Sequence, residues 1–413
     1  MNVHRHLYGF LLKITNRQLV PADYAICFYR ILLLSMTHSE PSTQEKYRAV
    51  FLLHALGDTI GFKNGEWEFN HDHQQHNDFD YTLELIFEFI QLGGSNDINL
   101  RGWHVSDDTI LHMMTAQALI DAGKKPSKKL GEGTATLLSQ AMTEGHLEGR
   151  APGSTTMESL KAIAEGKEKW NTIAYATTKG GSGASMRTSC IGLVLHEHSE
   201  VLELVEVAYI NSQITHNSAV GILGGITSAY FTSLAFNNVS IKKWPHKLLL
   251  LIRGGEIEKI VKKYRPETLE QFTKDREVFI NKWIRYVEMR FDDIGTPIEN
   301  KSMRNPAYRS YFYYTHFGYK ESKHRFPGSG GDDSVIIAYD CLLDSQRKWE
   351  TLIVYSMLHM GDSDTVGCIA ASWYGALYGF GSVPSRHLKY LESKNMLEDI
   401  ANDLYKKFES ESK

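Results

Sequence analysis

Residues 362–378 of this chain read DSDTVGCIAASWYGALY, and we expect this stretch to decide the fold. Apolar residues recur at intervals of three and four from Val366 onward, which is the spacing of one face of an α-helix. The other side is kept small by Gly367, Ala371, Gly375 and Ala376. The pattern predicts a buried helix that packs closely on its neighbours and begins at the acidic motif Asp362-Ser363-Asp364-Thr365.

A second acidic motif, Ser106-Asp107-Asp108-Thr109, precedes another periodic stretch, which we expect to be a helix that ends at Gly123. Ser, Asp and Thr are common at helix starts, where they cap free N–H groups and favour the helix dipole. One motif alone therefore indicates little. Two motifs bring four carboxylates and several hydroxyls to two remote helix starts, which exceeds what capping needs.

The donors in both motifs are all oxygen, and such donors suit Mg²⁺ better than Zn²⁺ or copper. An EF-hand is excluded, because Val366 and Trp373 stand at the fifth and twelfth positions from Asp362, where oxygen ligands are required. A two-ion site, with ions roughly 3.5 to 4 Å apart and bridged by carboxylates, fits better. The sequence thus predicts a metalloenzyme.

Helical periodicity prevails elsewhere, and strand alternation is scarce. We expect one all-α domain at residues 44–413, with an inner layer of buried helices and an outer solvated layer. The stretches that carry this expectation are 201–236, 334–343 and 259–290. Residues 1–43 form an extension, for which we favour an extra packed helix over a targeting segment. Its apolar run at 24–36 is too short to span a membrane.

Composition narrows the choice of partners. The chain has 413 residues, 42% of them hydrophobic, and a net charge of −4, so we expect no nucleic-acid partner. The four cysteines lack zinc spacing, and we interpret them as structural thiols in a reducing, cytoplasmic setting. They are Cys27, Cys190, Cys341 and Cys368.

Several further motifs occur in a fixed order along the chain: HALGDTIGF at 54–62, NGEWEF at 64–69, RGWHVSDDT at 101–109, GRAPG at 149–153, GGSGASMR at 180–187, TH at 215–216, GDD at 331–333, AYD at 338–340 and GDSDT at 361–365. In this order they resemble the motifs of the ADP-ribosylglycohydrolases, and most closely those of the ADP-ribosylarginine hydrolases. The resemblance runs from Glu45 to about Phe408.

The resemblance implies a compact all-α fold with a binuclear Mg²⁺ site. It also implies hydrolysis of the N-glycosidic bond between ADP-ribose and a protein arginine, with an arginine-linked protein as substrate and ADP-ribose as product. Its metal residues carry over onto Ser106, Asp107, Asp108, Asp362, Asp364 and Thr365. Two Mg²⁺ ions can hold the ribose hydroxyls and lower the pKa of a water, and Asp107 or Asp108 would then be the general base.

The residues expected to bind substrate are Asn64, Arg150, Gly181, Ser182, Gly183, Ser185, Met186, His216, Gly331 and Asp333. Residues 180–187, the glycine loop, can cradle a pyrophosphate with backbone N–H groups, although a tight turn before a helix is the plainer interpretation. It is not a GxGxxG loop, because Met186 occupies the last glycine position.

Other assignments stay open at this stage. His216 is a nucleotide contact or a satisfied buried histidine, and Arg150 meets a phosphate or a surface acid. The aromatic run at 311–314 is an adenine slot or core packing. Glu66 and Glu68 hold the arginine guanidinium or are solvated loop acids.

Two alternative functions are kept. The first is hydrolysis of O-linked ADP-ribose, on serine, in poly(ADP-ribose) or in O-acetyl-ADP-ribose. Against it, Asn64 stands near the place where the serine-type relatives have a glutamate that closes over the site. The second is a non-catalytic ADP-ribose-binding protein on the same fold, against which the intact metal residues argue.

Overall fold

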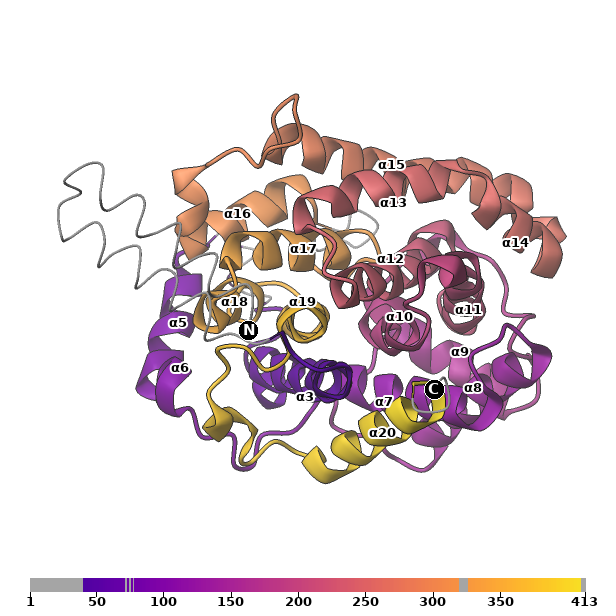
Figure 1. Ribbon diagram of the computed structural model, residues 1–413, viewed down its shortest axis with the longest axis horizontal. Helices are drawn as coiled ribbons and strands as arrows, with labels where there is room; N and C mark the ends of the chain where they lie inside the picture. The colour runs from indigo at the N-terminus through magenta and orange to yellow at the C-terminus, as the bar shows by residue number, and fades with distance from the viewer. Residues whose placement is uncertain (1–39, 71–72, 74–75, 77, 319–325, 410–413) are drawn as a thin grey trace, which may run out of the picture. The chain divides into compact units, whose positions relative to one another are not determined.

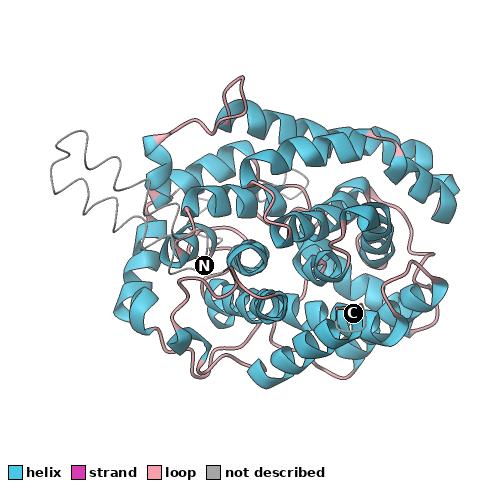
Figure 2. Cartoon of the chain, in the orientation of Figure 1, coloured by secondary structure: helices cyan, strands magenta, loops and turns pink. Residues whose placement is uncertain are grey.

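The computed structural model describes residues 40–70, 73, 76, 78–318 and 326–409. These residues are predominantly helical and contain no β-strand, only the isolated bridges Gly181↔Gly330 and Phe291↔Pro297 (Figure 2). The predicted all-α fold is therefore confirmed. The packed helix that we favoured for the N-terminal extension lies outside the described residues.

The α-helices are α3 (Thr43–Phe62), α5 (Tyr81–Gln91), α6 (Gly94–Asp97), α7 (Asp107–Ala122), α8 (Lys128–Thr143), α9 (Ser154–Ala164), α10 (Ser189–Val194), α11 (Val201–Gln213), α12 (Ala219–Phe236), α13 (Trp244–Arg253), α14 (Glu256–Tyr264), α15 (Leu269–Arg290), α16 (Pro306–His316), α17 (Asp333–Ser345), α18 (Trp349–Ser356), α19 (Ser363–Tyr378) and α20 (Lys394–Phe408). Short 3₁₀ helices are η1 (Lys63–Gly65), η2 (Thr177–Lys179), η3 (Ser182–Arg187), η4 (His198–Glu200), η5 (Ile241–Lys243), η6 (Pro266–Thr268), η7 (Lys301–Arg304) and η8 (Ser385–Leu388).

Helices α3 and α19 lie side by side at the centre of the domain (Figure 1). Glycines make this close approach possible. A Cβ atom at Gly57 would lie 2.4 Å from the carbonyl oxygen of Gly367, and one at Gly61 would lie 2.3 Å from that of Ser363. Larger residues would force the two helices apart. The small face predicted for residues 366–378 is thus the face that meets α3, and the contact brings Asp58 to the start of α19.

The helix predicted after the first acidic motif is α7. Ser106 caps it by accepting a hydrogen bond from the N–H of Asp108 at 3.1 Å, and Gly123, with φ of 87°, ends it as expected. The apolar stretch 201–236 forms two buried helices, α11 and α12. They are separated by residues 214–218, which include His216.

Helix α12 is the described helix that is long and apolar enough to cross a membrane, but 89% of its apolar window is buried inside the domain. Its hydropathy reflects its place in the core. There it contributes Phe231 to an aromatic cluster with Trp244, Trp283, Tyr339 and Trp373. The predicted inner layer of buried helices is present.

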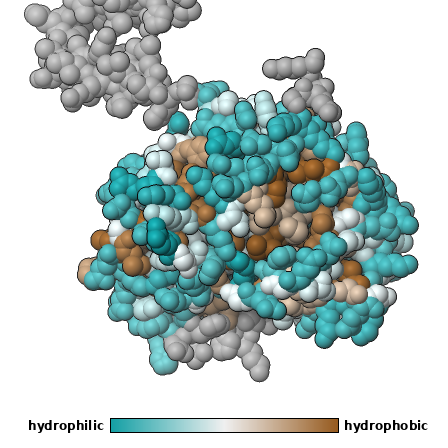
Figure 3. Space-filling model, turned by 90° about the horizontal axis from the view of Figure 1, so that it is seen from below, coloured by the Kyte–Doolittle hydropathy of each residue, from teal (hydrophilic) through white to brown (hydrophobic). Residues whose placement is uncertain are grey.

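The outer layer includes α15, whose exposed side carries charge while Phe279, Trp283 and Tyr286 face inward. Polar residues predominate on the face shown in Figure 3, and hydrophobic ones appear in patches between them. Behind α15, the carboxylate of Asp340 accepts from Arg290 at 2.7 Å and from Arg309 at 2.8 Å. Asp340, from the AYD motif, thus joins α15, α16 and α17.

Candidate active site

The two acidic motifs, although about 250 residues apart in the sequence, meet in the folded chain. The Thr365 hydroxyl at the start of α19 donates to Asp108 Oδ2 at the start of α7 over 2.8 Å. Beneath them, the carboxylate of Asp58 on α3 accepts from the backbone N–H groups of Ser106 at 3.0 Å and Thr109 at 3.2 Å. Asp58 therefore fixes the turn that presents Asp107 and Asp108.

A fifth carboxylate joins the two motifs. Single oxygens of Glu68, Asp362 and Asp364 lie within 4.8 Å of one another. We call Glu68, Asp107, Asp108, Asp362 and Asp364 the acidic cluster. Glu68 reaches it because the next residue, Phe69, is tied by its N–H to the carbonyl of Gly361 at 2.9 Å, directly before the second motif.

The four aspartates of the acidic cluster are buried and Glu68 is half-buried, and the described residues form no ion pair with them. The four aspartates are at most 5% exposed, and among the described residues no Lys, Arg or His lies within ion-pair distance of any of the five carboxylates. Burial and mutual repulsion raise the pKa of each carboxyl, that of Asp107 to about 7. Such a group of buried acids is costly unless it is protonated or binds cations.

These residues fit hard divalent ions. Five carboxylates with the hydroxyls of Ser106 and Thr365 form an all-oxygen donor set, which suits hard ions better than zinc or copper. The one nearby thiol, Cys368, lies 3.4 Å from Asp108 Oδ2, and burial holds its pKa well above the ordinary value, so it stays protonated.

A cleft of about 200 Å³ opens above the acidic cluster. One side of it is formed by the glycine loop, which contributes Gly181, Ser182, Gly183 and Met186. The Ser182 hydroxyl donates to Asp362 Oδ2 at 3.2 Å, so the loop is attached to the cluster itself. The other walls come from Phe69, Ala151, residues 153–156, His216 and Ser329.

His216 lines this cleft and is only 3% exposed. Its ring lies against the glycine loop: a Cβ atom at Gly183 would be 2.4 Å from His216 Cε1. Any larger residue at position 183 would collide with the ring. Burial, with the nearby Arg187 and Lys179, lowers the pKa of His216 to about 3, so the ring is neutral at physiological pH.

Several residues expected to touch substrate instead support the site from behind. Asp333 accepts from the N–H groups of Gly328 at 3.0 Å and Gly330 at 2.7 Å. Gly331 donates its N–H to the carbonyl of Gly180, and Ser185 donates to the carbonyl of Ser182. These three residues do not line the cleft, and each of them shapes the glycine loop or the loop paired with it.

Asn64 and Arg150 also lie away from the cleft lining. The side chain of Asn64 bridges the carbonyl of Gly102 and the N–H of His104, which precede the first acidic motif. Arg150 forms a double ion pair with Glu392, at 2.8 and 2.9 Å, so it meets an acid rather than a phosphate. Neither residue lines the cleft, and the bonds that they form support the segments around it.

The structure also places the aromatic run at 311–314 and Glu66. Phe312 and Tyr313 are buried and the Tyr313 hydroxyl binds Asp340, whereas Tyr311 is exposed, and none of the residues of the aromatic run lines the cleft. Glu66 is exposed and pairs with Lys63 at 2.7 Å, as a solvated loop acid would. Sequence reasoning missed the role of Asp58. The signal was its place in GDTIG, between the two glycines that contact α19.

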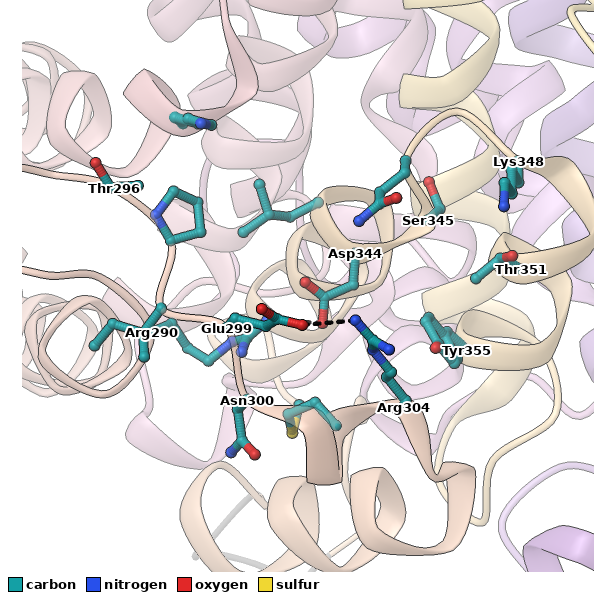
Figure 4. A pocket seen from close by; sticks show the side chains of 16 residues that line it. Arg290, Thr296, Glu299, Asn300, Arg304, Asp344, Ser345, Lys348, Thr351 and Tyr355 are labelled. Carbon is teal, nitrogen blue, oxygen red and sulfur yellow. Dashed lines mark hydrogen bonds and ion pairs between the residues drawn. The ribbon is translucent and has the colours of Figure 1, made fainter. Parts of the chain in front are cut away.

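A larger pocket, of about 590 Å³, lies elsewhere, between η7, α17 and α18 (Figure 4). Its acids are already paired. Glu299 and Arg304 point toward one another at 2.6 Å, and Asp344 binds Arg290 at 2.7 Å. This pocket therefore offers no free carboxylate to a cation, and its size alone does not make it the reaction site.

Comparison with known proteins agrees with the geometry. Residues 39–413 match a family model described as ADP-ribosylglycohydrolase. The chain is 40% identical over 326 residues to a putative ADP-ribosyl glycohydrolase of Acanthamoeba polyphaga mimivirus, a match that covers 78% of this chain and 62% of that protein.

Two further similarities complete the comparison. The ADP-ribosylhydrolase ARH1 of Dictyostelium discoideum is 33% identical over 380 residues, covering 87% of this chain and 94% of that protein. The human ADP-ribosylhydrolase ARH3 is 25% identical over 240 residues, which cover 55% and 58% of the two chains. A solved ADP-ribosylglycohydrolase-related protein complex aligns with a TM-score of 0.50 at 17% identity, covering 88% of this chain and 98% of that one, which supports the fold.

Proposed function

Because this chain belongs to the ADP-ribosylglycohydrolase family, we propose that it is a Mg²⁺-dependent hydrolase that removes ADP-ribose from a protein arginine. The observation that carries the proposal is the acidic cluster: five carboxylates, four of them buried, at the bottom of a cleft that the glycine loop borders, with no Lys, Arg or His of the described residues in an ion pair with them. A site with these features binds hard cations and an anionic ligand together.

The ions would be held by Glu68, Asp107, Asp108, Asp362, Asp364 and Thr365, with Ser106 at the start of α7. When bound, two Mg²⁺ ions supply charge that orients the ribose hydroxyls and makes a water more acidic. The protein would hold the pyrophosphate with the N–H groups of the glycine loop and keep bulk water from the glycosidic carbon.

We propose Asp107 rather than Asp108 as the general base. Asp108 Oδ2 already accepts the hydroxyl of Thr365, whereas no side-chain hydrogen bond occupies the Asp107 carboxylate, which faces the cleft. With Mg²⁺ bound, the Asp107 carboxyl would stay ionised near neutral pH, so that it could take a proton from water. ADP-ribose and the protein with its unmodified arginine are the products of that hydrolysis.

The arginine linkage is supported by charge. A guanidinium is a cation, and five ionised carboxylates still exceed the charge of two Mg²⁺ ions, so the cleft attracts it. Glu68 lines the cleft and is the least buried of the five, so a carboxylate oxygen that it does not give to an ion is the one best placed to hold the guanidinium before it departs. The match to ARH1 also covers more of this chain, at higher identity, than the match to ARH3.

Hydrolysis of an O-linked ADP-ribose is the second candidate. Glu68 favours it, because this residue supplies a carboxylate to the cleft although position 64 has no glutamate. A competition experiment separates the two. Peptides that carry arginine-linked and serine-linked ADP-ribose are mixed with the enzyme and Mg²⁺, and the loss of each is followed by mass spectrometry. We expect the arginine-linked peptide to disappear faster, and the reverse order would assign the serine linkage.

A further inference from the structure

The cleft contains one polar atom whose chemical state can be derived from the hydrogen bonds around it. This atom is Nε2 of His216. It lies about 3 Å from where a Cβ of Gly181 or Gly183 would stand, and no described residue forms a hydrogen bond with it. The side chain is buried, so the atom is reserved for something that enters the cleft.

The other ring nitrogen, Nδ1, lies 2.8 Å from the hydroxyl oxygen of Thr215. That hydroxyl has a single proton. It also receives a hydrogen bond from Nη1 of Arg187 at 2.9 Å, and a guanidinium can only donate. The described residues offer this proton no acceptor other than His216 Nδ1, so the hydroxyl donates to that nitrogen.

Arg187 is held in place beside Thr215. Its guanidinium is fully buried and is held by three other acceptors: the side chain of Asn211 at 2.9 Å, the carbonyl of Asn211 at 2.8 Å, and the carbonyl of Gly183. The same cation thus orients both the hydroxyl behind His216 and the glycine loop in front of it.

We infer that Arg187 and Thr215 are positioning residues that fix His216 as the tautomer protonated on Nε2, so that it donates a hydrogen bond to an acceptor oxygen of the ADP-ribose held in the cleft. Since the ring is neutral, it accepts no proton from the reaction and acts only as a donor. The inference deepens the proposed function and rests on it for the identity of the ligand.

The tautomer is measured directly on the ligand-free, full-length protein labelled with ¹⁵N in histidine. Two-bond ¹H–¹⁵N correlation spectra distinguish a protonated ring nitrogen from an unprotonated one, and the His216 signals are identified by their loss in His216→Gln. We expect a protonated Nε2, an unprotonated Nδ1 and no titration between pH 5 and 8. A protonated Nδ1 in the wild-type protein overturns the inference, whatever the protein hydrolyses.

Three variants test whether the Thr215 hydroxyl sets the tautomer of His216. Thr215→Val removes the hydroxyl, Thr215→Ser keeps it, and Thr227→Val makes the same change at a buried threonine of α12 that bonds only within its helix, to Leu223. Calorimetric titration with ADP-ribose in Mg²⁺ should show about tenfold weaker binding for Thr215→Val, the cost of one hydrogen bond to a charged acceptor, and near wild-type binding for the other two.

The His216 spectrum of Thr215→Val should at the same time show both tautomers. A merely structural role for Thr215 would lower stability without moving the tautomer, so an unchanged spectrum together with an unchanged Kd overturns the inference. Should the wild-type protein bind no ADP-ribose, the proposed function fails, and the spectra of the ligand-free proteins still decide whether Arg187 and Thr215 set the tautomer.

Discussion

Replacing Asp107 with asparagine should stabilise the metal-free protein while it abolishes activity. Asp107 is 5% exposed, and burial, together with the neighbouring Asp58 carboxylate, raises its pKa from 3.8 to about 7. The folded protein therefore keeps the Asp107 proton at pH values at which the unfolded chain has lost it. Between about pH 4 and pH 7, the stability of the metal-free protein must fall as pH rises.

Above pH 7 the Asp107 carboxyl is ionised, so the full free-energy cost of burying its charge lowers the stability of the metal-free protein. The change in pKa corresponds to at most about 4 kcal/mol, and relaxation around the charge brings the expected gain for Asp107→Asn at pH 8 to about 1–3 kcal/mol. At pH 5 the wild-type carboxyl is mostly protonated and resembles the amide, so the gain should shrink toward zero. Asparagine has nearly the same size, so no cavity arises to confuse the comparison.

The assay is urea unfolding in EDTA at pH 5 and pH 8, for the wild type, Asp107→Asn and the matched surface variant Asp97→Asn. Asp97 is 77% exposed and pairs only with Arg386, so its replacement should change little at either pH. A variant at position 107 that is less stable than the wild type at pH 8 would refute the claim that the cluster carries uncompensated charge.

Three other predictions follow from the same geometry. Asp107→Asn and Asp108→Asn should each lower kcat for ADP-ribose release by about 10²-fold or more, with circular dichroism unchanged, and near wild-type turnover would remove that residue from the site. Mg²⁺ at 100 times its Kd should stabilise the protein by about 2.7 kcal/mol for each ion bound, and the thermal shift should be larger at pH 8 than at pH 5, because protons compete for the same carboxylates. A chain that starts at Glu40 keeps the Ser42 cap of α3 and should retain hydrolysis of a small ADP-ribosylated substrate. A folded but inactive truncation would show that the extension completes the site.

The sequence predicted the parts of this site that depend on local pattern. Period and small residues identified α19, and a capping motif before an apolar stretch identified α7, so the starts of both helices were placed correctly. The sequence also predicted that the glycine loop and His216 belong near the acidic motifs. Local pattern suffices here because each motif is short and its geometry is set by its own helix.

Contacts between remote segments were harder to predict. Arg150 meets Glu392, which lies 242 residues away, and nothing in the local sequence of either residue reveals the partner. Asn64 and Asp333 bind backbone groups of neighbouring loops, and a polar side chain that supports a loop has the same sequence signature as one that binds substrate. Asp58 was missed as a support because its partners, Ser106 and Thr109, come to it only when α7 packs on α3.

The central claim is that the acidic cluster holds the divalent ions that hydrolysis requires. The most direct test is ADP-ribose release from an arginine-linked substrate by protein stripped with EDTA and then titrated with Mg²⁺. The account predicts no release above background in the stripped protein and full recovery when about two ions per chain are bound. Undiminished release from protein shown to be metal-free would contradict it.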